Sequence, residues 1–379
     1  MQAYGDNRVF GLDLLRVVAI LLVVFSSVYF IVPDIQGAIY QLMSVAGVVG
    51  VEIFLVLSGF LVGKTFYKLY LKEDFSFKAI KHFWLRRWFR VLPNYVLALI
   101  FSILVNIYIG HNLPNDLWKY FVLLQNFVSD TSSGFFYESW SITVGEFTAL
   151  LGPLFLYCTL FIKTKISKSR LFLLITLLVI AIFLISKWLY SLNDNAKTME
   201  AWSTGLKTVV IYRIDAVYYG VLVGYISIVK PRFWKQCKYF ALVLSLLLFY
   251  CVHVVVNQSY WFIETHPTFW NVWYLPLNSI AIVLILPFLS QWHTTPKMMS
   301  QSIRFLSSIA YAVYVIHYSI VLRLMMNNIP SRNLPKFDSI IYILVYISIL
   351  VLLGYFINRY FEEPLRTIRN SSKTNHFFK

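Results

Sequence analysis

The chain has 379 residues, of which 59% are apolar, 18% aromatic and only 13% charged, and its mean hydropathy is +0.68. This composition excludes a soluble globular domain, because soluble domains carry far more charged residues. The net charge of +16 is dispersed over many short segments with no recognised nucleic-acid module, so it indicates membrane topology and no nucleic-acid partner.

Ten apolar stretches are long enough to cross a bilayer, which predicts an all-α, polytopic membrane protein with about ten transmembrane helices. In chain order they are 11–31, 45–66, 91–110, 143–162, 170–190, 210–229, 238–256, 272–290, 305–325 and 337–357. A shorter apolar run at 118–128 predicts a re-entrant or interfacial segment. No repeat or long linker divides the chain, so we predict one membrane domain over 1–379, with its core at about 11–358.

Lysine and arginine concentrate on the cytoplasmic side of membrane proteins, and this bias gives an orientation. With the N-terminus inside, 24 of the 33 basic residues fall in inner segments, eight of them between Lys64 and Arg90. The predicted location is the plasma (inner) membrane, with both termini cytoplasmic. The basic tail 359–379 is expected to lie on anionic headgroups and is too short for a further soluble domain.

Ionisable residues inside apolar spans are costly, so each is a candidate functional residue. Arg16 lies about a third of the way into the first span, and Arg86, Arg87 and Arg90 come just before the third span at the same inner level. Arginine binds phosphate in a bidentate manner and stays charged when desolvated. Together the four predict a site for a phosphate-rich cytosolic ligand. The alternative for the last three is that they are ordinary positive-inside anchors.

A second group of polar residues lies toward the outer ends of the spans. Its members are Ser27, Glu52, Trp140, Glu146, Arg213, Asp215 and His317. Ser27 follows Arg16 by eleven residues, which returns it to within about 20° of the same helix face, roughly 16 Å further along the axis. The sequence therefore predicts a transmembrane polar cavity with a basic inner mouth.

Several outer residues also have a purely structural interpretation. Arg213 and Asp215 would form an ion pair with each other, and His317 would be a hydrogen-bonded core histidine. Ser26 and Ser27 would bond back to helix carbonyls, as serines in membrane helices commonly do. The outer tryptophans would suit either sugar stacking or an interfacial aromatic belt. These tryptophans are Trp140, Trp202, Trp261 and Trp270.

Eight motifs follow one another along the chain. They are GLDLLRVVAILLVV, GVEIFLVLSGFLV, RRWFRVLP, LLQNF, WSITVGEFTALLGP, YRIDAVYYG, AYAVYVIH and FEEP. In this order they resemble the acyltransferase-3 family of integral membrane acyltransferases, in the O-acetyltransferase form without an appended esterase-like domain. The resemblance covers nearly the whole chain. It implies an enzyme that moves acetyl or other acyl groups, typically onto sugars of cell-envelope polysaccharides.

The resemblance also implies ligands. The donor substrate would be acyl-CoA, with acetyl-CoA favoured, and its phosphates would meet Arg16, Arg86, Arg87 and Arg90. The acceptor would be a hydroxyl of a carbohydrate or lipid-linked glycan. A histidine would act as general base or acyl relay, since imidazole titrates near neutrality. Membrane lipid and a second copy of the chain are further expected partners, and no metal is expected.

The site residues implied by the motifs fall into two sets. The catalytic candidates are Ser27, Arg16, Glu52, Glu146 and His317. The residues expected to be structural or to face the acceptor are Trp140, Ser141, Arg213, Asp215, Ser58, Gly59, Tyr311 and Glu362.

The chain departs from the family pattern at three positions. The family's first helix carries an arginine, ten residues and a histidine, but counting on from Arg16 reaches Ser27. A serine hydroxyl is no general base at neutral pH. Gly145 stands at the first position of an acidic pair of which Glu146 remains, and Ala310 replaces a usual serine.

Three explanations for Ser27 remain open at this point. The chain is an active-site variant of an ordinary enzyme, for instance one made to trap substrate; or it is a natural non-catalytic relative; or the chemistry has moved to His317 with Glu52 or Glu146. A rival from another class is a transporter or binding protein for an acyl-bearing or lipid-linked ligand. The inverted repeats typical of many transporters are not found in the sequence.

Overall fold

The computed structural model describes residues 8–32, 37–129, 134–193, 196–329 and 334–370. These residues contain helices and no strand, which confirms the all-α prediction. The long helices are α1 (Phe10–Ser27), α2 (Ala38–Tyr70), α3 (Phe77–Tyr108), α5 (Ser139–Cys158), α6 (Lys168–Asn193), α8 (Ile214–Val229), α10 (Lys238–Tyr250), α12 (Tyr274–Leu289), α13 (Lys297–Ile316) and α15 (Lys336–Ile357).

Shorter helices extend or connect the long ones. They are α4 (Trp118–Phe121), α7 (Met199–Trp202), α9 (Pro231–Gln236), α11 (Val256–Gln258), α14 (Arg323–Asn328) and α16 (Glu363–Asn370). Three single turns are 3₁₀-helical: η1 (Val28–Phe30), η2 (Thr159–Phe161) and η4 (Val210–Tyr212). Five are π-helical: η3 (Ser203–Lys207), η5 (Cys251–Val255), η6 (Phe269–Trp273), η7 (His317–Leu322) and η8 (Asn358–Glu362).

Nine helical segments in the described part of the chain are long and apolar enough to cross a membrane. They match nine of the ten predicted spans. The tenth span was predicted at 210–229. There the structure has the 16-residue helix α8, and the first residues of the predicted span form the separate turn η4. A 16-residue helix is about 24 Å long, less than the usual 30 Å apolar thickness. It is tolerated because α8 lies buried among other helices.

Two predicted boundaries need correction. The third span was predicted to begin at 91, but α3 begins at Phe77 and carries the whole RRWFRVLP motif. The last span was predicted at 337–357, and α15 ends at Ile357, but η8 and α16 continue the helix without a break to Asn370. Apolar and amphipathic residues continue the helical pattern through both places, so hydropathy alone placed the helix ends wrongly.

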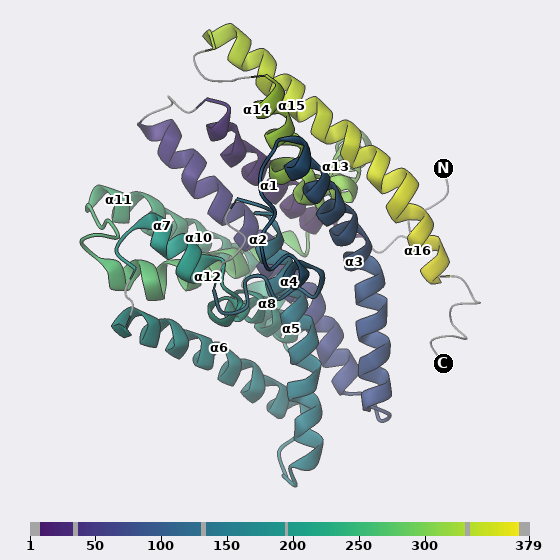
Figure 1. Cartoon of the computed structure of the whole chain (residues 1–379). Coiled ribbons are helices and arrows are strands. Elements are labelled where there is room, and N and C mark those ends of the chain that lie inside the picture. Colours follow the sequence, from purple (N-terminus) through teal and green to yellow (C-terminus); the bar gives the residue numbers. More distant parts are fainter. Residues whose placement is uncertain (1–7, 33–36, 130–133, 194–195, 330–333, 371–379) are drawn as a thin grey trace.

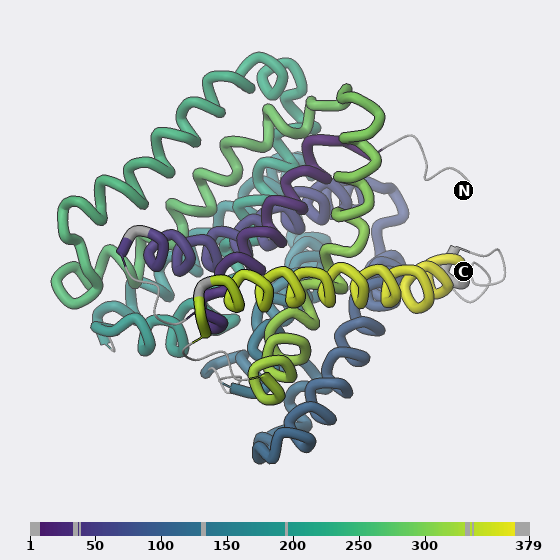
Figure 2. Tube along the Cα trace, turned by 90° about the horizontal axis from the view of Figure 1, so that it is seen from above, coloured from purple at the N-terminus to yellow at the C-terminus, as the bar shows by residue number. Residues whose placement is uncertain are grey.

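The helices divide into an inner and an outer set. The apolar windows of the spans that contain α13, α12 and α1 are 72%, 67% and 61% buried, whereas those of α10, α15 and α6 are 17%, 22% and 28% buried. Figure 1 shows α15 with α16, and α6, along different edges of the bundle. In Figure 2 the yellow α15 runs across the outside of the bundle. The outer helices therefore present apolar side chains to lipid.

Two glycines allow α2 and α8 to cross closely at the centre of the bundle. A Cβ on Gly59 would lie 1.9 Å from the carbonyl oxygen of Val217, and one on Gly220 would lie 2.1 Å from that of Val56. Small residues let membrane helices approach backbone to backbone, which replaces the hydrophobic driving force absent in lipid. The glycines of two motifs thus hold together the helices that carry Glu52 and Asp215.

We expect Gly59→Ala to lower stability, because the added methyl group meets a backbone oxygen that cannot move without shifting α8. Overpacking of this kind costs about 1–3 kcal/mol or more. The measurement is the apparent melting temperature of the purified protein in detergent. Gly145→Ala is the matched control, because its Cβ would meet only Arg87 Nη2, at 3.7 Å. Equal melting temperatures for the two variants would contradict a close α2–α8 contact.

The predicted re-entrant segment 118–128 packs into the protein and holds the start of α5. The Gln125 side chain donates to Thr143 Oγ1 (2.9 Å) and Ser139 Oγ (3.2 Å). The Asn126 side chain donates to the carbonyl of Trp140 (3.2 Å), and both amide side chains are buried. The LLQNF motif therefore holds the first turn of α5 in place, and several of the candidate site residues lie on or beside that turn.

Candidate functional site

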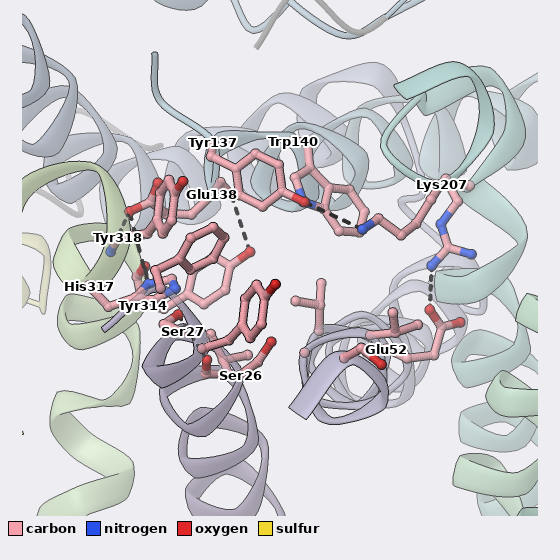
Figure 3. Close-up of a pocket in the computed structure, with 18 of the residues that line it drawn as sticks. Ser26, Ser27, Glu52, Tyr137, Glu138, Trp140, Lys207, Tyr314, His317 and Tyr318 are labelled. Atoms are coloured by element: carbon pink, nitrogen blue, oxygen red, sulfur yellow. Dashed lines mark hydrogen bonds and ion pairs between the residues drawn. The ribbon is translucent and has the colours of Figure 1, made fainter. Parts of the chain in front are cut away.

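A cavity of about 320 Å³ opens where α1 and η1 meet α2, α5, η3 and η7. Figure 3 shows Ser26, Ser27, Tyr314, His317 and Tyr318 gathered at one side, with Glu52 and Lys207 at the other. This volume is at the lower end of the range for small-molecule sites. The cavity lies at the end of α1 away from Arg16, and none of the four arginines of the predicted basic inner mouth lines it.

A wide helical turn places the only described histidine of the cavity. His317 begins the π-helix η7, in which the regular i→i−4 hydrogen bonds are interrupted. The freed backbone N–H groups of Tyr318 and Ser319 donate to Glu138 Oε1, at 3.2 and 2.9 Å. Ser319 Oγ donates to the other oxygen of the same carboxylate. Wide turns of this kind often mark functional sites.

The surroundings of His317 fix its tautomer. Its Nδ1 lies 2.6 Å from the carbonyl oxygen of Tyr314, and a carbonyl only accepts, so Nδ1 carries the hydrogen. Glu138 Oε1 lies 3.9 Å from the same nitrogen and would stabilise a positive charge on the ring. Nε2 of the neutral ring then holds a lone pair, and no residue in the described part of the chain bonds to it. This is the arrangement that a general base requires.

Two further hydroxyls support this side of the cavity. Tyr314 shares a 2.6 Å hydrogen bond with Ser141 Oγ and lies within 3.2 Å of the Glu138 carbonyl oxygen. Tyr346 donates to the carbonyl of His317 at 3.2 Å. These bonds tie α5, α13 and α15 to the histidine and restrict its movement.

Ser27 lines the same cavity as His317, at the position where the motif places a histidine. Its hydroxyl donates to the Val23 carbonyl one turn back, at 3.1 Å, so the structural interpretation is confirmed for this serine. Ser26 also lines the cavity. Ile20 and Val23, on the helix face between Arg16 and Ser27, are buried, so packed side chains occupy that face.

The opposite side of the cavity carries a buried ion pair. Arg213 donates to one oxygen of Glu52, and Ser279 Oγ donates to the other. The guanidinium carbon of Arg213 lies 6.0 Å from the centre of the Trp140 ring. Asp215 pairs separately with Lys187 of α6, which is fully buried. The suggested Arg213–Asp215 pair is therefore wrong, because residues two positions apart on a helix point about 200° apart and meet different neighbours.

Aromatic rings form a continuous wall along the cavity. Their centres are separated by 5.1 Å from Tyr40 to Tyr29, 5.7 Å from Tyr29 to Phe30, 5.1 Å from Phe30 to Tyr318 and 5.5 Å from Tyr318 to Tyr137. All five rings line the cavity. Such a wall offers apolar ring faces together with phenol hydroxyls, which suits a ligand with alternating apolar and hydroxylated surfaces.

Arg16 belongs to a separate cluster near the start of α1. It donates to Asp13 Oδ1 at 2.7 Å, and Arg8 (3.0 Å) and Ser307 (2.8 Å) donate to the same oxygen. The Arg16 side chain is 25% exposed, so it is partly accessible from outside the protein. Asp13 is buried, and its carboxylate holds the Arg16 side chain in place while that side chain stays partly exposed.

The three arginines of α3 are not equivalent. Arg87 is half-buried and lies 2.9 Å from Glu146 Oε1, and it also donates to the carbonyl of Gly145. Arg86 and Arg90 are exposed and share one face of the helix. Glu146 therefore does not line the cavity with His317, although the sequence placed both at the outer level. Two turns of α5 separate it from Trp140.

The comparisons with known proteins agree with this architecture. The profile of a family described as "Acyltransferase domain" matches residues 9–359. The chain belongs to this acyltransferase family. It is also 25% identical, over 94% of its length, to a Bacillus subtilis (strain 168) protein named "Putative peptidoglycan O-acetyltransferase YrhL". The chain spans 55% of that relative, so about half of the relative's length is matched. No solved structure matches the chain.

The remaining motif residues of this acyltransferase have structural partners. Tyr311 donates to the Val91 carbonyl at 3.0 Å, which joins α13 to α3. Glu362 accepts from Asn94 of α3 and lies 3.0 Å from Arg366. Ser58 is half-buried beside Gly59 on α2, and Ala310 is buried. None of these residues lines the cavity.

Sequence reasoning missed three charged residues of the acyltransferase. Glu138 comes just before the α5 motif, Lys187 sits in an otherwise apolar span, and Lys207 lies between two spans. Lys187 carried a signal, since an ionisable residue deep in a span calls for a partner. Glu138 and Lys207 lie in loop-like sequence, where charged residues are ordinary and nothing distinguishes them.

Proposed function

We propose that this acyltransferase moves an acyl group, with acetyl favoured, from cytosolic acyl-CoA to a hydroxyl of a cell-wall glycan bound in the cavity. Family membership and the relative named as a peptidoglycan O-acetyltransferase support this reaction class. The single observation that carries the proposal is His317, which lines the cavity with Ser27 while its Nδ1 is held by the Tyr314 carbonyl, so that among the described residues Nε2 has no partner.

The donor would bind at the Arg16 end of α1. The Arg16 side chain is partly exposed, and Arg86 and Arg90 are exposed on α3, which suits charge-assisted bonds to the phosphates of CoA. In the predicted orientation this end is cytoplasmic. The flexible arm of the donor would then carry the thioester along α1 to the cavity, and the packed residues Ile20 and Val23 would have to shift to admit it.

The chemistry would use His317 in place of the missing first-helix histidine. Nε2 takes the proton of the acceptor hydroxyl as its oxygen forms a bond to the thioester carbonyl carbon. The carbon–sulfur bond then breaks, and the proton passes to the departing CoA thiolate. Glu138 would stabilise the transient imidazolium and hold the ring in place. This is the third of the explanations for Ser27, with Glu138 in the supporting role that the sequence had suggested for Glu52 or Glu146.

Donor binding and transfer together test this proposal. Acetyl-CoA is added to the purified protein, and binding is measured by calorimetry. The measurement is made for the unchanged protein and for Arg16→Gln. We expect the dissociation constant to rise about 10-fold or more in the variant, since a bond to a charged group contributes about 1.5–3 kcal/mol. Arg170→Gln is the matched control, because Arg170 is exposed on α6.

Transfer is then measured as release of the CoA thiol in the presence of peptidoglycan fragments, for the protein as it is and for Ser27→His. Turnover by the serine form supports the proposal. Turnover by the Ser27→His form alone would show that the general base belongs at position 27 and that this chain is an inactive enzyme. Absence of acetyl-CoA binding in both forms would favour the transporter or binding protein instead.

A further inference from the structure

The second charged side chain that the sequence missed at the cavity is Lys207, at the end of the π-helix η3. It is half-buried, and its Nζ lies 3.4 Å from the Tyr137 hydroxyl, near the upper limit for a hydrogen bond. Nζ also lies 5.9 Å from the centre of the Trp202 ring. Among the described residues no carboxylate pairs with it.

The two carboxylates of the cavity are already paired, whereas Arg213, the partner of Glu52, keeps Nε and Nη1 buried without a hydrogen-bond partner among the described residues. Glu52 is held by Arg213 and Ser279, and Glu138 accepts two backbone N–H bonds and a serine hydroxyl. A lysine ammonium is strongly hydrated and loses that hydration when it is partly buried in a cavity. An anionic group of a ligand would replace the lost water and supply the missing charge.

The position of Lys207 relative to His317 would let one ligand contact both side chains. Figure 3 shows Lys207 and His317 at different sides of the same cavity, with the Tyr137 ring near its top between them. Both residues line a space of about 320 Å³, which suits a small ligand such as a single sugar ring. A sugar placed against the aromatic wall could present a hydroxyl to Nε2 and a charged substituent to Nζ.

We propose that Lys207 binds an anionic oxygen group, a carboxylate or a phosphate, carried by the acceptor sugar, and so selects charged over neutral acceptors. This inference rests on the proposed function for its choice of a sugar acceptor. The charge preference itself is a binding property, so it can be measured without any acyl transfer.

Binding of three probes tests the proposal. They are glucuronate, glucose 6-phosphate and glucose, which differ in the charged group while sharing a sugar ring. Binding to the full chain in detergent is measured by saturation-transfer NMR. We expect one or both charged probes to bind at least about 10-fold more tightly than glucose, which corresponds to about 1.4 kcal/mol. The probe that gains identifies the carboxylate or the phosphate as the preferred group.

Three variants make the result specific. Lys207→Met should abolish the difference between charged and neutral probes and leave glucose binding little changed, while Lys207→Arg should keep most of the difference. Lys197→Met is the matched control, since Lys197 is exposed. Equal binding of all three probes, or an equal loss of every probe in Lys207→Met, would overturn the proposal.

The outcomes separate this inference from the proposed function. Charge-selective binding that depends on Lys207, without transfer from acetyl-CoA to any acceptor, would keep the anion site and refute the acyl transfer. Transfer that shows no preference for charged acceptors, together with equal probe binding, would keep the enzyme and refute the anion site.

Discussion

Replacing His317 by glutamine is expected to reduce acyl transfer by about 10²–10⁴-fold, the usual contribution of a positioned general base. The glutamine amide can still donate to the Tyr314 carbonyl, which His317 Nδ1 contacts at 2.6 Å, but it has no basic nitrogen. The loss should appear in kcat. The dissociation constant for acetyl-CoA, whose proposed site is at the other end of α1, should stay within about twofold of its original value, since uniform binding is not removed.

His293→Gln serves as the matched control for this result. His293 is exposed in the segment between α12 and α13, outside the cavity. A His317→Gln enzyme that keeps more than a tenth of its turnover, while folding normally, would remove the histidine from the chemistry. A parallel fall in kcat and in acetyl-CoA binding would point to a general loss of structure instead.

Removing the ammonium of Lys187 is expected to cause the largest loss of stability. Lys187→Met leaves the Asp215 carboxylate buried in the membrane interior without its cation, and breaking a buried pair in this way costs about 3–5 kcal/mol. Lys187 has 0% of its side chain exposed and Asp215 has 1%, so water cannot replace the lost partner. The yield of folded protein and the apparent melting temperature in detergent should both fall.

The double variant Lys187→Met with Asp215→Leu should recover most of this loss, because an apolar pair needs no charge compensation. Lys197→Met, at an exposed position, should change neither quantity. If the double variant were no more stable than Lys187→Met, the destabilisation would come from altered packing, and the Lys187–Asp215 pair would not be its cause. The experiment also tests the corrected pairing, since an Arg213–Asp215 pair would leave Lys187→Met nearly silent.

The sequence by itself determined the membrane class, the existence of nine of the ten predicted spans and the order of the family motifs. These follow from local properties: a run of about 20 apolar residues has to be a helix in lipid, whatever its neighbours are. Arg16 and Ser27 do lie on one helix, α1, as predicted, because the apolar run that holds both is local in the sequence and the 3.6-residue period fixes their relative positions.

Partners between helices were decided only by the tertiary structure. The Glu52–Arg213 pair joins residues 161 positions apart, and no periodicity tells which of several buried acids a buried arginine will meet. The same limit explains why Glu146 was placed beside the cavity although it pairs with Arg87 of α3.

The setting of His317 depended on the backbone itself. Its candidacy could be read from the sequence, but its tautomer and its Glu138 partner arise because η7 widens to a π-turn that frees two N–H groups and one carbonyl. Whether a helix widens at a given residue is settled by the packing around it, which here includes Tyr346 of α15 and the buried carboxylate of Glu138. Apolar pattern and charge are local properties that can be read from the sequence. A site assembled from several separate helical segments exists only once those segments have packed.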